Sequence, residues 1–478
     1  MTDLLLISPD SSREVYQGLA DGYTAIETPT WALLLAGALR KDYDVAIHDP
    51  LAEGLTDGVA GWRATRHRPR LIAFVVYGQN PNSGTTNMAG AVRLAREIRA
   101  WSNIPIAFIG PHASALPEET LKLDCVDYVL PGDGLHALRH LLDNPYRVFS
   151  RVVWGPPADP SEFTEYAWDL LPPLTSYRAH NWFAGYDDAK RSPYAAIYTS
   201  LGCTFKCDFC MINMVNRASP TQRDAAEASG MRFLPTDMVL REFEKLAAMG
   251  VKHVRIADEM FFLNRQHYLP ILNGLIERNL GLNLWAYARV DTVRPEHLAL
   301  FKKAGVNWLA LGIESGDQKV RREVTKGRYE DVDIRRVCQD IRDAGIGLVA
   351  NFLFGLPGDT QESMQRTLDL ALELCAEHTN VYPCMALPGS PIYRKAVEAG
   401  QPVPEGFSAF SFHSYDCQPL PTATLTAAEV LAFRDKAWHT IFTDSRYLSL
   451  VHAKFGQVAV DHLDAQTKIT LRRKLLET

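Results

Sequence analysis

The chain has 478 residues, of which 47% are hydrophobic and 22% charged, and its formal net charge at pH 7 is -6. This composition predicts a globular protein of two or three domains, and the acidic balance argues against a nucleic-acid partner. The apolar run at the start spans only residues 4–7, and no later run approaches the roughly 18 residues of a membrane span. We therefore expect a cytoplasmic protein without a membrane span, and its eight cysteines fit a reducing compartment.

Residues 1–145 are predicted to form an α/β domain. Short apolar runs alternate there with helical stretches, at residues 4–7, 43–47, 71–77, 104–109 and 126–130. This pattern is typical of a Rossmann-like parallel sheet covered by helices on both faces, which binds ligands at the carboxyl ends of its strands. The loops predicted at those ends carry small and polar residues suited to a large flat ligand: Ser8, Gln79, Ser83, Thr85, Gly110, His112, Ser114 and Gly132.

Residues 146–190 are predicted to be a linker, because prolines are frequent there and long apolar runs are few. Several aromatic residues in this segment are expected to clamp the flanking domains together: Trp168, Tyr177, Trp182, Phe183 and Tyr186.

Residues 191–400 are predicted to form a partial parallel (β/α)6 barrel. Strand patterns at residues 194–198, 253–257, 282–288, 308–313, 347–354 and 380–385 alternate with helical periods such as 238–249 and 267–278. Barrels of this kind place their chemistry at the carboxyl ends of the strands. The residues that interrupt or follow the apolar runs there are Asp258, Glu259, Arg289, Glu314 and Gly355.

Three cysteines, Cys203, Cys207 and Cys210, follow the first barrel strand within eight residues. Three thiolates at this spacing can hold three irons of a 4Fe-4S cubane and leave the fourth iron open to a ligand that is not protein. A zinc knuckle or three reduced structural thiols are the alternatives. A zinc site normally has a fourth cysteine or histidine at matching spacing, and none occurs nearby. The remaining cysteines of the barrel and C-terminal region lack metal-like spacing and are predicted to be structural: Cys338, Cys375, Cys384 and Cys417.

The pattern Cys203-x3-Cys207-x2-Cys210, with Phe209 before the last cysteine, resembles the signature of the radical S-adenosylmethionine family. The resemblance implies that S-adenosyl-L-methionine binds the open iron of a 4Fe-4S cluster and is cleaved to a 5'-deoxyadenosyl radical. An external electron donor such as flavodoxin or ferredoxin is then needed.

The same resemblance assigns roles to the residues at the strand ends. Asp258 and Glu259 stand where the family binds the methionyl amine of S-adenosylmethionine. Arg289 and Glu314 stand where it often holds the carboxylate and ribose. Phe209 and the segment around Gly355 are implied to lie near the adenine.

The N-terminal domain precedes the cysteine motif and carries Gly-Pro-His-Ala-Ser at residues 110–114 and Val-Asp-Tyr-Val-Leu-Pro-Gly-Asp-Gly at residues 126–134. This arrangement resembles the cobalamin-dependent (class B) radical S-adenosylmethionine enzymes over nearly the whole chain. Many cobalamin domains have Asp-x-His-x-x-Gly after the first strand, but residues 10–13 read Asp-Ser-Ser-Arg. We therefore expect cobalamin with its nucleotide base displaced and no histidine in its place. The lower cobalt face is then empty, water-filled or covered by residues 77–86, and His112 is a packing or hydrogen-bonding residue.

Residues 401–478 are predicted to form a small helical region that caps the open side of the barrel. Thr426 and Glu429 make a capping box for a helix through Thr440, and further helices are expected around residues 447–454 and 465–477. An aromatic patch precedes them and is either plain core or a substrate contact: Phe407, Phe410, Phe412, His413 and Tyr415.

The leading hypothesis is a methyltransferase that methylates an unactivated carbon, or phosphorus, of a small-molecule substrate through methylcobalamin and a 5'-deoxyadenosyl radical. The alternative keeps both cofactors but transfers no methyl group, as in an oxidative cyclase. A methylthiotransferase is disfavoured, because that family has three further cluster cysteines before the motif, whereas residues 1–202 contain only Cys125. A non-catalytic cobalamin sensor would have no use for the three-cysteine loop.

Overall fold

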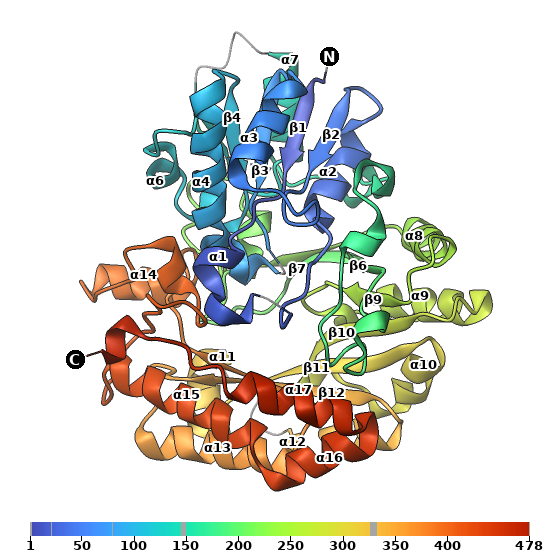
Figure 1. Cartoon of the computed structure of the whole chain (residues 1–478), viewed down its shortest axis with the longest axis vertical. Coiled ribbons are helices and arrows are strands. Elements are labelled where there is room, and N and C mark those ends of the chain that lie inside the picture. Colours follow the sequence, from blue (N-terminus) through green and yellow to red (C-terminus); the bar gives the residue numbers. More distant parts are fainter. Residues whose placement is uncertain (1, 21, 79, 145–149, 326–331, 478) are drawn as a thin grey trace.

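The computed structural model describes residues 2–20, 22–78, 80–144, 150–325 and 332–477. It contains two parallel sheets, a five-stranded one from the N-terminal region and a six-stranded, curved one from the middle of the chain. Figure 1 shows the N-terminal sheet with its helices at the top and the curved sheet below it. The α/β fold class predicted from the sequence is confirmed.

The N-terminal sheet has the strand order β2-β1-β3-β4-β5, and every pair is parallel. Its strands confirm the five predicted ones: β1 (Leu4–Ile7), β2 (Val45–His48), β3 (Leu71–Val75), β4 (Ile106–Ile109) and β5 (Tyr128–Leu130). Helices α2 (Thr30–Leu39) and α7 (Leu135–Asp143) share one hydrophobic core with Leu4 and Leu6. Helices α3 (Asp57–Arg66) and α4 (Gly84–Trp101) pack on the opposite face. Coverage of both faces explains why these strands are apolar throughout.

The middle sheet has the order β13-β12-β11-β10-β9-β6 and is parallel throughout. Its strands are β6 (Tyr194–Ile197), β9 (His253–Ile256), β10 (Asn283–Arg289), β11 (Val306–Glu314), β12 (Gly347–Phe354) and β13 (His378–Pro383). The accompanying helices are α8 (Thr236–Ala248), α9 (Arg265–Arg278), α10 (Leu298–Lys303), α11 (Gln318–Thr325), α12 (Ile334–Asp343) and α13 (Gln361–Leu374). The predicted partial barrel is confirmed. Strand β13 ends at Pro383, before the predicted residue 385, because its partner strand β12 ends at Phe354, which pairs with Pro383.

An antiparallel hairpin of β7 (Ser200–Cys203) and β8 (Gly230–Phe233) follows β6 and was not predicted. Gly202 has φ +80°, and a Cβ there would lie 2.4 Å from both Asn216 Nδ2 and the Gly230 carbonyl oxygen. Only glycine fits this position, which lies immediately before the first cysteine of the motif.

The linker aromatics have two different roles. Trp168 Nε1 donates to Glu242 of α8 at 2.8 Å, and Tyr177 donates to Asp49 beyond β2 at 3.1 Å, so these two residues fasten the linker to each domain. Trp182 packs instead on Trp285 at 4.8 Å, near the amino-terminal end of β10. The expected clamp is therefore correct only in part, since Trp182 and its neighbour fill the amino-terminal end of the barrel.

The C-terminal region begins with α14 (Pro391–Glu398) and continues with α15 (Ala427–Phe442), α16 (Ser445–Phe455) and α17 (Gln457–Thr467). The predicted capping box starts α15. The helix predicted over residues 465–477 is wrong, because beyond Thr467 the described chain has only a short 3-10 turn, Lys474–Leu476. β-Branched residues follow Thr467, and Arg473 binds Asp435 of α15 at 2.8 Å, which holds this segment extended along the helix.

Irregular segments line the open side of the barrel, between the edge strands β6 and β13. Thr28 exchanges hydrogen bonds with the Ala196 backbone of β6. Phe412 packs edge-on against Tyr382 of β13 at 4.9 Å, and the His413 carbonyl oxygen accepts a hydrogen bond from Gln17 at 2.6 Å. The predicted helical C-terminal region is confirmed, and its helix α15 packs along β13, while these irregular segments lie on the open side.

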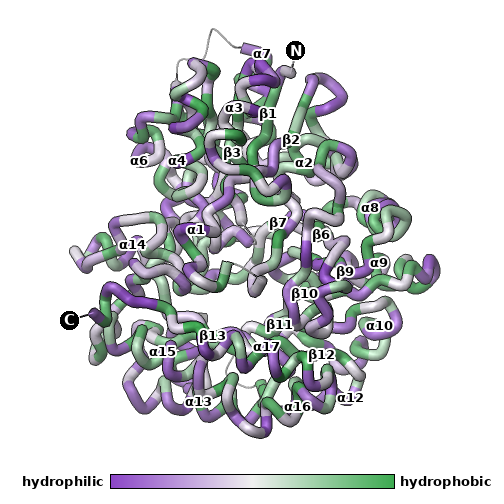
Figure 2. The backbone as a smooth tube through the Cα atoms, viewed as in Figure 1, coloured by the Kyte–Doolittle hydropathy of each residue, from purple (hydrophilic) through white to green (hydrophobic). Residues whose placement is uncertain are grey.

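Hydrophobic residues concentrate on the strands and on the helix faces that cover them, as Figure 2 shows. In the part of the chain that the structure describes, no helix combines the length and the apolar character needed to cross a membrane.

Candidate functional site

The loops at the carboxyl ends of the N-terminal sheet meet the cysteine-bearing hairpin. Asn82, in the loop after β3, accepts a hydrogen bond from the Met211 backbone N–H at 3.1 Å, and its amide lies 3.9 Å from Cys210 Sγ. Arg232 of β8 forms an ion pair with buried Asp133 at 2.7 Å. Arg217 binds the Ser114 carbonyl oxygen. The two regions predicted to hold cobalamin and the iron-sulfur cluster are therefore in direct contact.

The cysteine loop is fixed at both ends by backbone hydrogen bonds. The Cys203 N–H donates to Asn213 Oδ1 at 2.7 Å, and the Asp208 N–H donates to the Val324 carbonyl oxygen of α11 at 3.1 Å. The Asp208 carbonyl oxygen accepts from Ile392 of α14 at 2.9 Å. This support comes from Asn213, α11 and α14, so three separate parts of the chain fix the loop that carries the thiols.

The three thiols are near neighbours in a buried environment. Burial raises the pKa of Cys203 to about 12 and that of Cys207 to about 11. Burial, with the charges of the other two cysteines, raises the pKa of Cys210 well above its usual value. Such thiols stay protonated unless a bound cation stabilises the thiolates, as iron does.

Within the described ranges, no three His, Cys, Asp or Glu side chains converge on a single metal ion. A 4Fe-4S cubane does not need three side chains to meet at one metal ion, because each thiolate binds a different iron of the cluster. The donor set of three cysteines on one pinned loop fits a 4Fe-4S cluster with one open iron.

Asp258 and Glu259 differ sharply although they are adjacent. Asp258 is fully buried, and its carboxylate accepts hydrogen bonds from the Thr199 hydroxyl and the Ser200 hydroxyl, both at 2.6 Å, and from the Thr199 N–H. Glu259 Oε1 is buried without a hydrogen-bond partner among the described residues, and burial raises the pKa of Glu259 to about 8. Asp258 therefore fixes the start of the hairpin, and Glu259 is the carboxylate available to a ligand.

Arg289 and Glu314 lie beside the cysteine loop. The Arg289 guanidinium lies over the Phe205 ring at 3.5 Å and is also bound by Asp291. Glu314 ends β11 with φ +68°, and burial raises its pKa to about 7, while Arg289 opposes the rise. The charges of Glu314 and Arg289 both act on the pKa of Cys207. The structure thus brings these two predicted residues together at the cluster.

Phe209 lies on the cysteine loop itself, and Gly355 directly follows β12. Gly355 has φ +80°, and a Cβ there would lie 2.3 Å from Val430 of α15. Its N–H and that of Leu356 donate to Asp359 at 3.0 and 2.9 Å. Phe209 packs against the small hydrophobic cluster that contains Leu356. The two residues implied to lie near adenine therefore lie on the same side of the candidate site.

Among the residues predicted for cobalamin, Ser114 and two glycines form a buried framework. The Ser114 hydroxyl donates to the Gly110 carbonyl oxygen at 2.7 Å and accepts from the Gly132 N–H at 2.9 Å. A Cβ at Gly110 would lie 2.3 Å from the Val76 carbonyl oxygen, and one at Gly132 would lie 2.5 Å from that of Arg217. These residues shape the sheet edge, and their side-chain bonds are already used within the protein.

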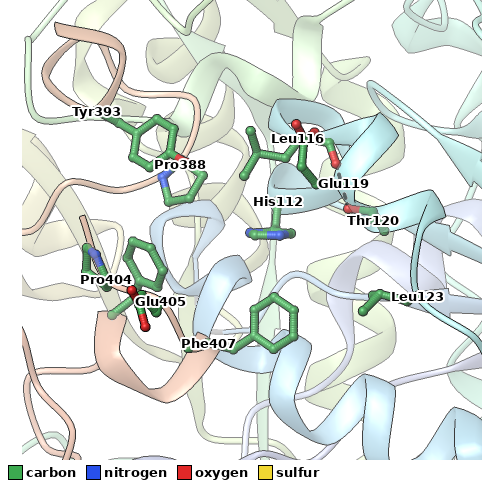
Figure 3. Close-up of a pocket in the computed structure, with 12 residues that line it drawn as sticks. His112, Leu116, Glu119, Thr120, Leu123, Pro388, Tyr393, Pro404, Glu405 and Phe407 are labelled. Carbon is green, nitrogen blue, oxygen red and sulfur yellow. Dashed lines mark hydrogen bonds between the residues drawn. The ribbon is translucent and has the colours of Figure 1, made fainter. Parts of the chain in front are cut away.

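His112 is buried and lies at the N-terminus of a short helix, α5 (Pro111–Ala115). Its Nδ1 lies 3.3 Å from the hydroxyl of Thr85, and burial lowers its pKa to about 4, so the imidazole is neutral. It contributes to a pocket of about 160 Å³ between α5, α6 (Pro117–Leu121) and the C-terminal region, where its ring faces Phe407 edge-on at 5.3 Å (Figure 3). Its contacts are those of a packing and hydrogen-bonding residue.

The remaining residues predicted for cobalamin lie in two loops. Ser8 follows β1, and Ser83 ends a 3-10 turn, Pro81–Ser83, before α4; both are partly exposed. Gln79 lies outside the described residues. Ser8 and Ser83 are small and partly exposed at the sheet edge, so they leave room there for a flat macrocycle, which fits cobalamin.

Four residues that join the two halves of this site were not identified from the sequence. Asn82 and Asn213 hold the cysteine loop, and Arg217 and Arg232 hold the hairpin against the N-terminal domain. Asn213 follows the last cysteine by three residues, which is the one positional signal among them.

Two family models match the chain: the radical SAM superfamily over residues 197–371 and the B12 binding domain over residues 18–142. The hopanoid C-2 methylase of Rhodopseudomonas palustris is 23% identical over 391 residues, which cover 80% of this chain and 67% of that protein. The anaerobic magnesium-protoporphyrin IX monomethyl ester cyclase of Rubrivivax gelatinosus is 29% identical over 408 residues, which cover 81% of this chain and 68% of that protein.

Among solved structures, the radical S-adenosylmethionine methyltransferase TsrM from Kitasatospora setae, with cobalamin and a [4Fe-4S] cluster bound, superposes with a TM-score of 0.62 at 22% identity. The match covers 84% of this chain and 78% of TsrM, and it shows that the two share a fold. The two family models, matched in the order seen in the structure, decide the assignment. The chain is a cobalamin-dependent enzyme of the radical SAM superfamily, and its cofactors are a 4Fe-4S cluster, S-adenosylmethionine and cobalamin.

Proposed function

We propose that the protein is a methyltransferase that methylates an unactivated carbon, or phosphorus, of a small molecule. The observation that carries this proposal is the contact between the loop after β3 and the cysteine loop, through Asn82, Met211 and Cys210. This contact brings the cobalamin domain next to the cluster loop, so a substrate at this junction would be within reach of both cofactors.

The cofactors would supply complementary chemistry when bound, with a transferable methyl group from cobalamin and a hydrogen-abstracting radical from S-adenosylmethionine at the cluster. The residues of the chain bind and orient these groups. Glu259 would accept the ammonium of S-adenosylmethionine, because its carboxylate has an oxygen without a protein partner among the described residues. Arg289, stacked on Phe205, would orient the carboxylate beside Cys207.

A relative and a structural neighbour support the same proposal. The hopanoid methylase and TsrM are both named for methyl transfer. A second candidate is an oxidative cyclase without methyl transfer, because the magnesium-protoporphyrin IX monomethyl ester cyclase is 29% identical to this chain. Both candidates need an electron from outside, and we propose an external donor such as flavodoxin or ferredoxin. Lys206 is exposed on the cysteine loop and offers a cationic contact to such acidic proteins.

The test is incubation of the anaerobically reconstituted protein with S-adenosylmethionine labelled in its methyl group and with metabolites from its gene neighbourhood. A methyltransferase yields a product that carries one labelled methyl group. A product with an unchanged carbon count, formed together with 5'-deoxyadenosine, identifies the cyclase instead.

A further inference from the structure

Aromatic and polar side chains from distant segments form a ring on the open side of the barrel. Its members are Tyr16, Glu27, Arg255, Tyr287, Tyr382, Phe412 and His413. One half of the ring consists of aromatic contacts. Phe412 lies 4.0 Å from His413 and 4.9 Å from Tyr382, and His413 lies 5.3 Å from Tyr16, measured between ring centres.

The other half of the ring is organised by Arg255 of β9. Its Nη1 lies 3.3 Å from Glu27 Oε1, and its Nη2 donates to the Tyr287 hydroxyl at 3.3 Å. The rings of Trp285 and Tyr287 flank the guanidinium at 4.9 and 5.3 Å. Because Glu27 neutralises Arg255, this half of the ring adds no net charge.

Two residues of the N-terminal region connect the two halves. The ring of Tyr16 contacts His413 in the first half, and Glu27, which pairs with Arg255 in the second half, accepts a hydrogen bond from the Tyr194 hydroxyl of β6 at 2.9 Å. Tyr16, Glu27, Tyr287, Tyr382, Phe412 and His413 are all partly exposed although they lie within the fold, and Arg255 is only 1% exposed. The six partly exposed residues therefore face an internal space, with Arg255 in the wall behind them.

The ring is close to the cluster loop. Tyr287 lies two residues before Arg289 on β10, so both side chains point to the same face of the sheet, and the Arg289 guanidinium lies over the ring of Phe205 in the cysteine loop at 3.5 Å. Burial lowers the pKa of His413 well below its usual value, so its imidazole is neutral. The space beside the cluster is thus lined by ring faces, phenol hydroxyls, a neutral imidazole and the Glu27 carboxylate, which is paired with Arg255.

We propose that this ring lines the substrate chamber and that the substrate presents an uncharged planar aromatic or heteroaromatic ring to it. Flat π-systems gain from offset and edge-on contacts with Tyr16, Tyr382 and Phe412, while phenol and imidazole groups hydrogen-bond to ring substituents. A saturated molecule of equal size would lose the aromatic part of this attraction. The inference rests on the proposed function only for the reaction that follows binding.

The test is equilibrium dialysis of the full chain, with cluster and cobalamin bound, against 2-naphthol and its saturated counterpart decahydro-2-naphthol. We expect 2-naphthol to bind about tenfold more tightly, which corresponds to two or three aromatic contacts. The double variant Phe412→Leu/Tyr382→Leu keeps apolar volume but removes two ring faces, and it should reduce this preference to about twofold. Tyr415→Leu is the matched control, because Tyr415 lies over Arg472 and binds Glu477, outside the ring.

Two results would overturn the proposal that the ring lines the substrate chamber. One is equal binding of the two probes, and the other is an undiminished preference for 2-naphthol in the double variant with normal iron and cobalamin content. Normal content also excludes misfolding as the cause of a loss. Dialysis involves no turnover, so the two proposals can fail separately. Loss of the preference in the double variant, together with a product of unchanged carbon count, would support the proposed chamber and contradict the proposed methyltransferase.

Discussion

The two sheets present their strand ends to each other with opposite chemistry. At the edge of the N-terminal sheet, Ser114 and the glycines around it have their hydrogen bonds satisfied within the protein, and the missing side chains of Gly110 and Gly132 allow backbone segments to pack closely. At the edge of the barrel, Glu259 and Glu314 are partly buried and have raised pKa values. The first edge is suited to a ligand by its shape, and the second edge is suited to a ligand by its charge.

This difference matches the two cofactors. Cobalamin is a large ligand that needs room and close backbone approach, whereas S-adenosylmethionine is small and carries an ammonium, a carboxylate and a sulfonium. Buried carboxylates with raised pKa values are destabilising until a cationic ligand arrives. The barrel edge is therefore expected to be sensitive to pH and to charge, and the sheet edge to be sensitive to volume.

The largest expected effect is the loss of the cluster. Cys207→Ala removes one of the three thiolates, so reconstituted protein should fall from about four irons per chain to nearly none and should form no 5'-deoxyadenosine. Cobalamin should still bind, because its site lies on the other sheet. Iron content and the cobalamin absorption spectrum measure both outcomes, with Cys338→Ala in α12 as the control that keeps its iron. Iron retained in Cys207→Ala, or close to eight irons per chain in the unchanged protein, would disprove the single-cluster assignment.

The second effect concerns the contact between the two edges. Arg232→Met leaves Asp133, which is 2% exposed, without its ion-pair partner, and the cost should be about 3 kcal/mol of unfolding free energy. Arg223→Met is the matched control, because Arg223 pairs with Glu227 on the surface and should contribute less than about 1 kcal/mol. Urea denaturation compares the two variants. Equal stabilities would show that the hairpin does not depend on this pair.

The strands and the cysteine motif were predictable from the sequence, but the contacts between the two sheet edges were not. The apolar strands and the cysteine spacing are local patterns, so all eleven parallel strands were found within a few residues of their positions. Asn82 and Arg232 act on residues more than 90 positions away, and no local pattern marks them. The hairpin was missed because β7 is only four residues long and contains Gly202, which is unfavourable in a strand.

The third effect tests the charge of the barrel edge. Because burial raises the pKa of Glu259 to about 8, the folded chain holds a proton there that the unfolded chain loses near pH 4.5. Stability is therefore lost as the pH rises from about 5 to 8. Glu259→Gln should reduce this loss by roughly 1 kcal/mol, or about 2 °C in Tm at pH 8, in protein free of S-adenosylmethionine.

The same substitution should weaken binding of S-adenosylmethionine about tenfold, because an ammonium loses its charged acceptor. Asp258→Asn provides the contrast, since its amide nitrogen cannot accept the hydrogen bonds of the Thr199 and Ser200 hydroxyls, and it should lower Tm at both pH values. Thermal unfolding at pH 5 and pH 8, with calorimetric titration of the ligand, distinguishes the two carboxylates. If Glu259→Gln binds S-adenosylmethionine normally, the assignment of Glu259 is wrong.

The smallest effect is expected at His112. The bound cob(II)alamin should show no nitrogen superhyperfine splitting in its electron paramagnetic resonance spectrum, and His112→Ala should leave that spectrum unchanged. The reason is that residues 10–13 contain no histidine and that His112 is engaged by Thr85 and Phe407. A nitrogen splitting that disappears in His112→Ala would instead make it a cobalt ligand.

The proposed methyltransferase uses both edges in a single methyl transfer. The ratio of S-adenosylhomocysteine to 5'-deoxyadenosine formed per methylated product, by the reconstituted enzyme with its substrate, tests this directly. Methyl supply and radical formation draw on separate molecules of S-adenosylmethionine, so we expect one of each per product. Formation of 5'-deoxyadenosine without S-adenosylhomocysteine, and a product with no added carbon, would contradict the methyltransferase.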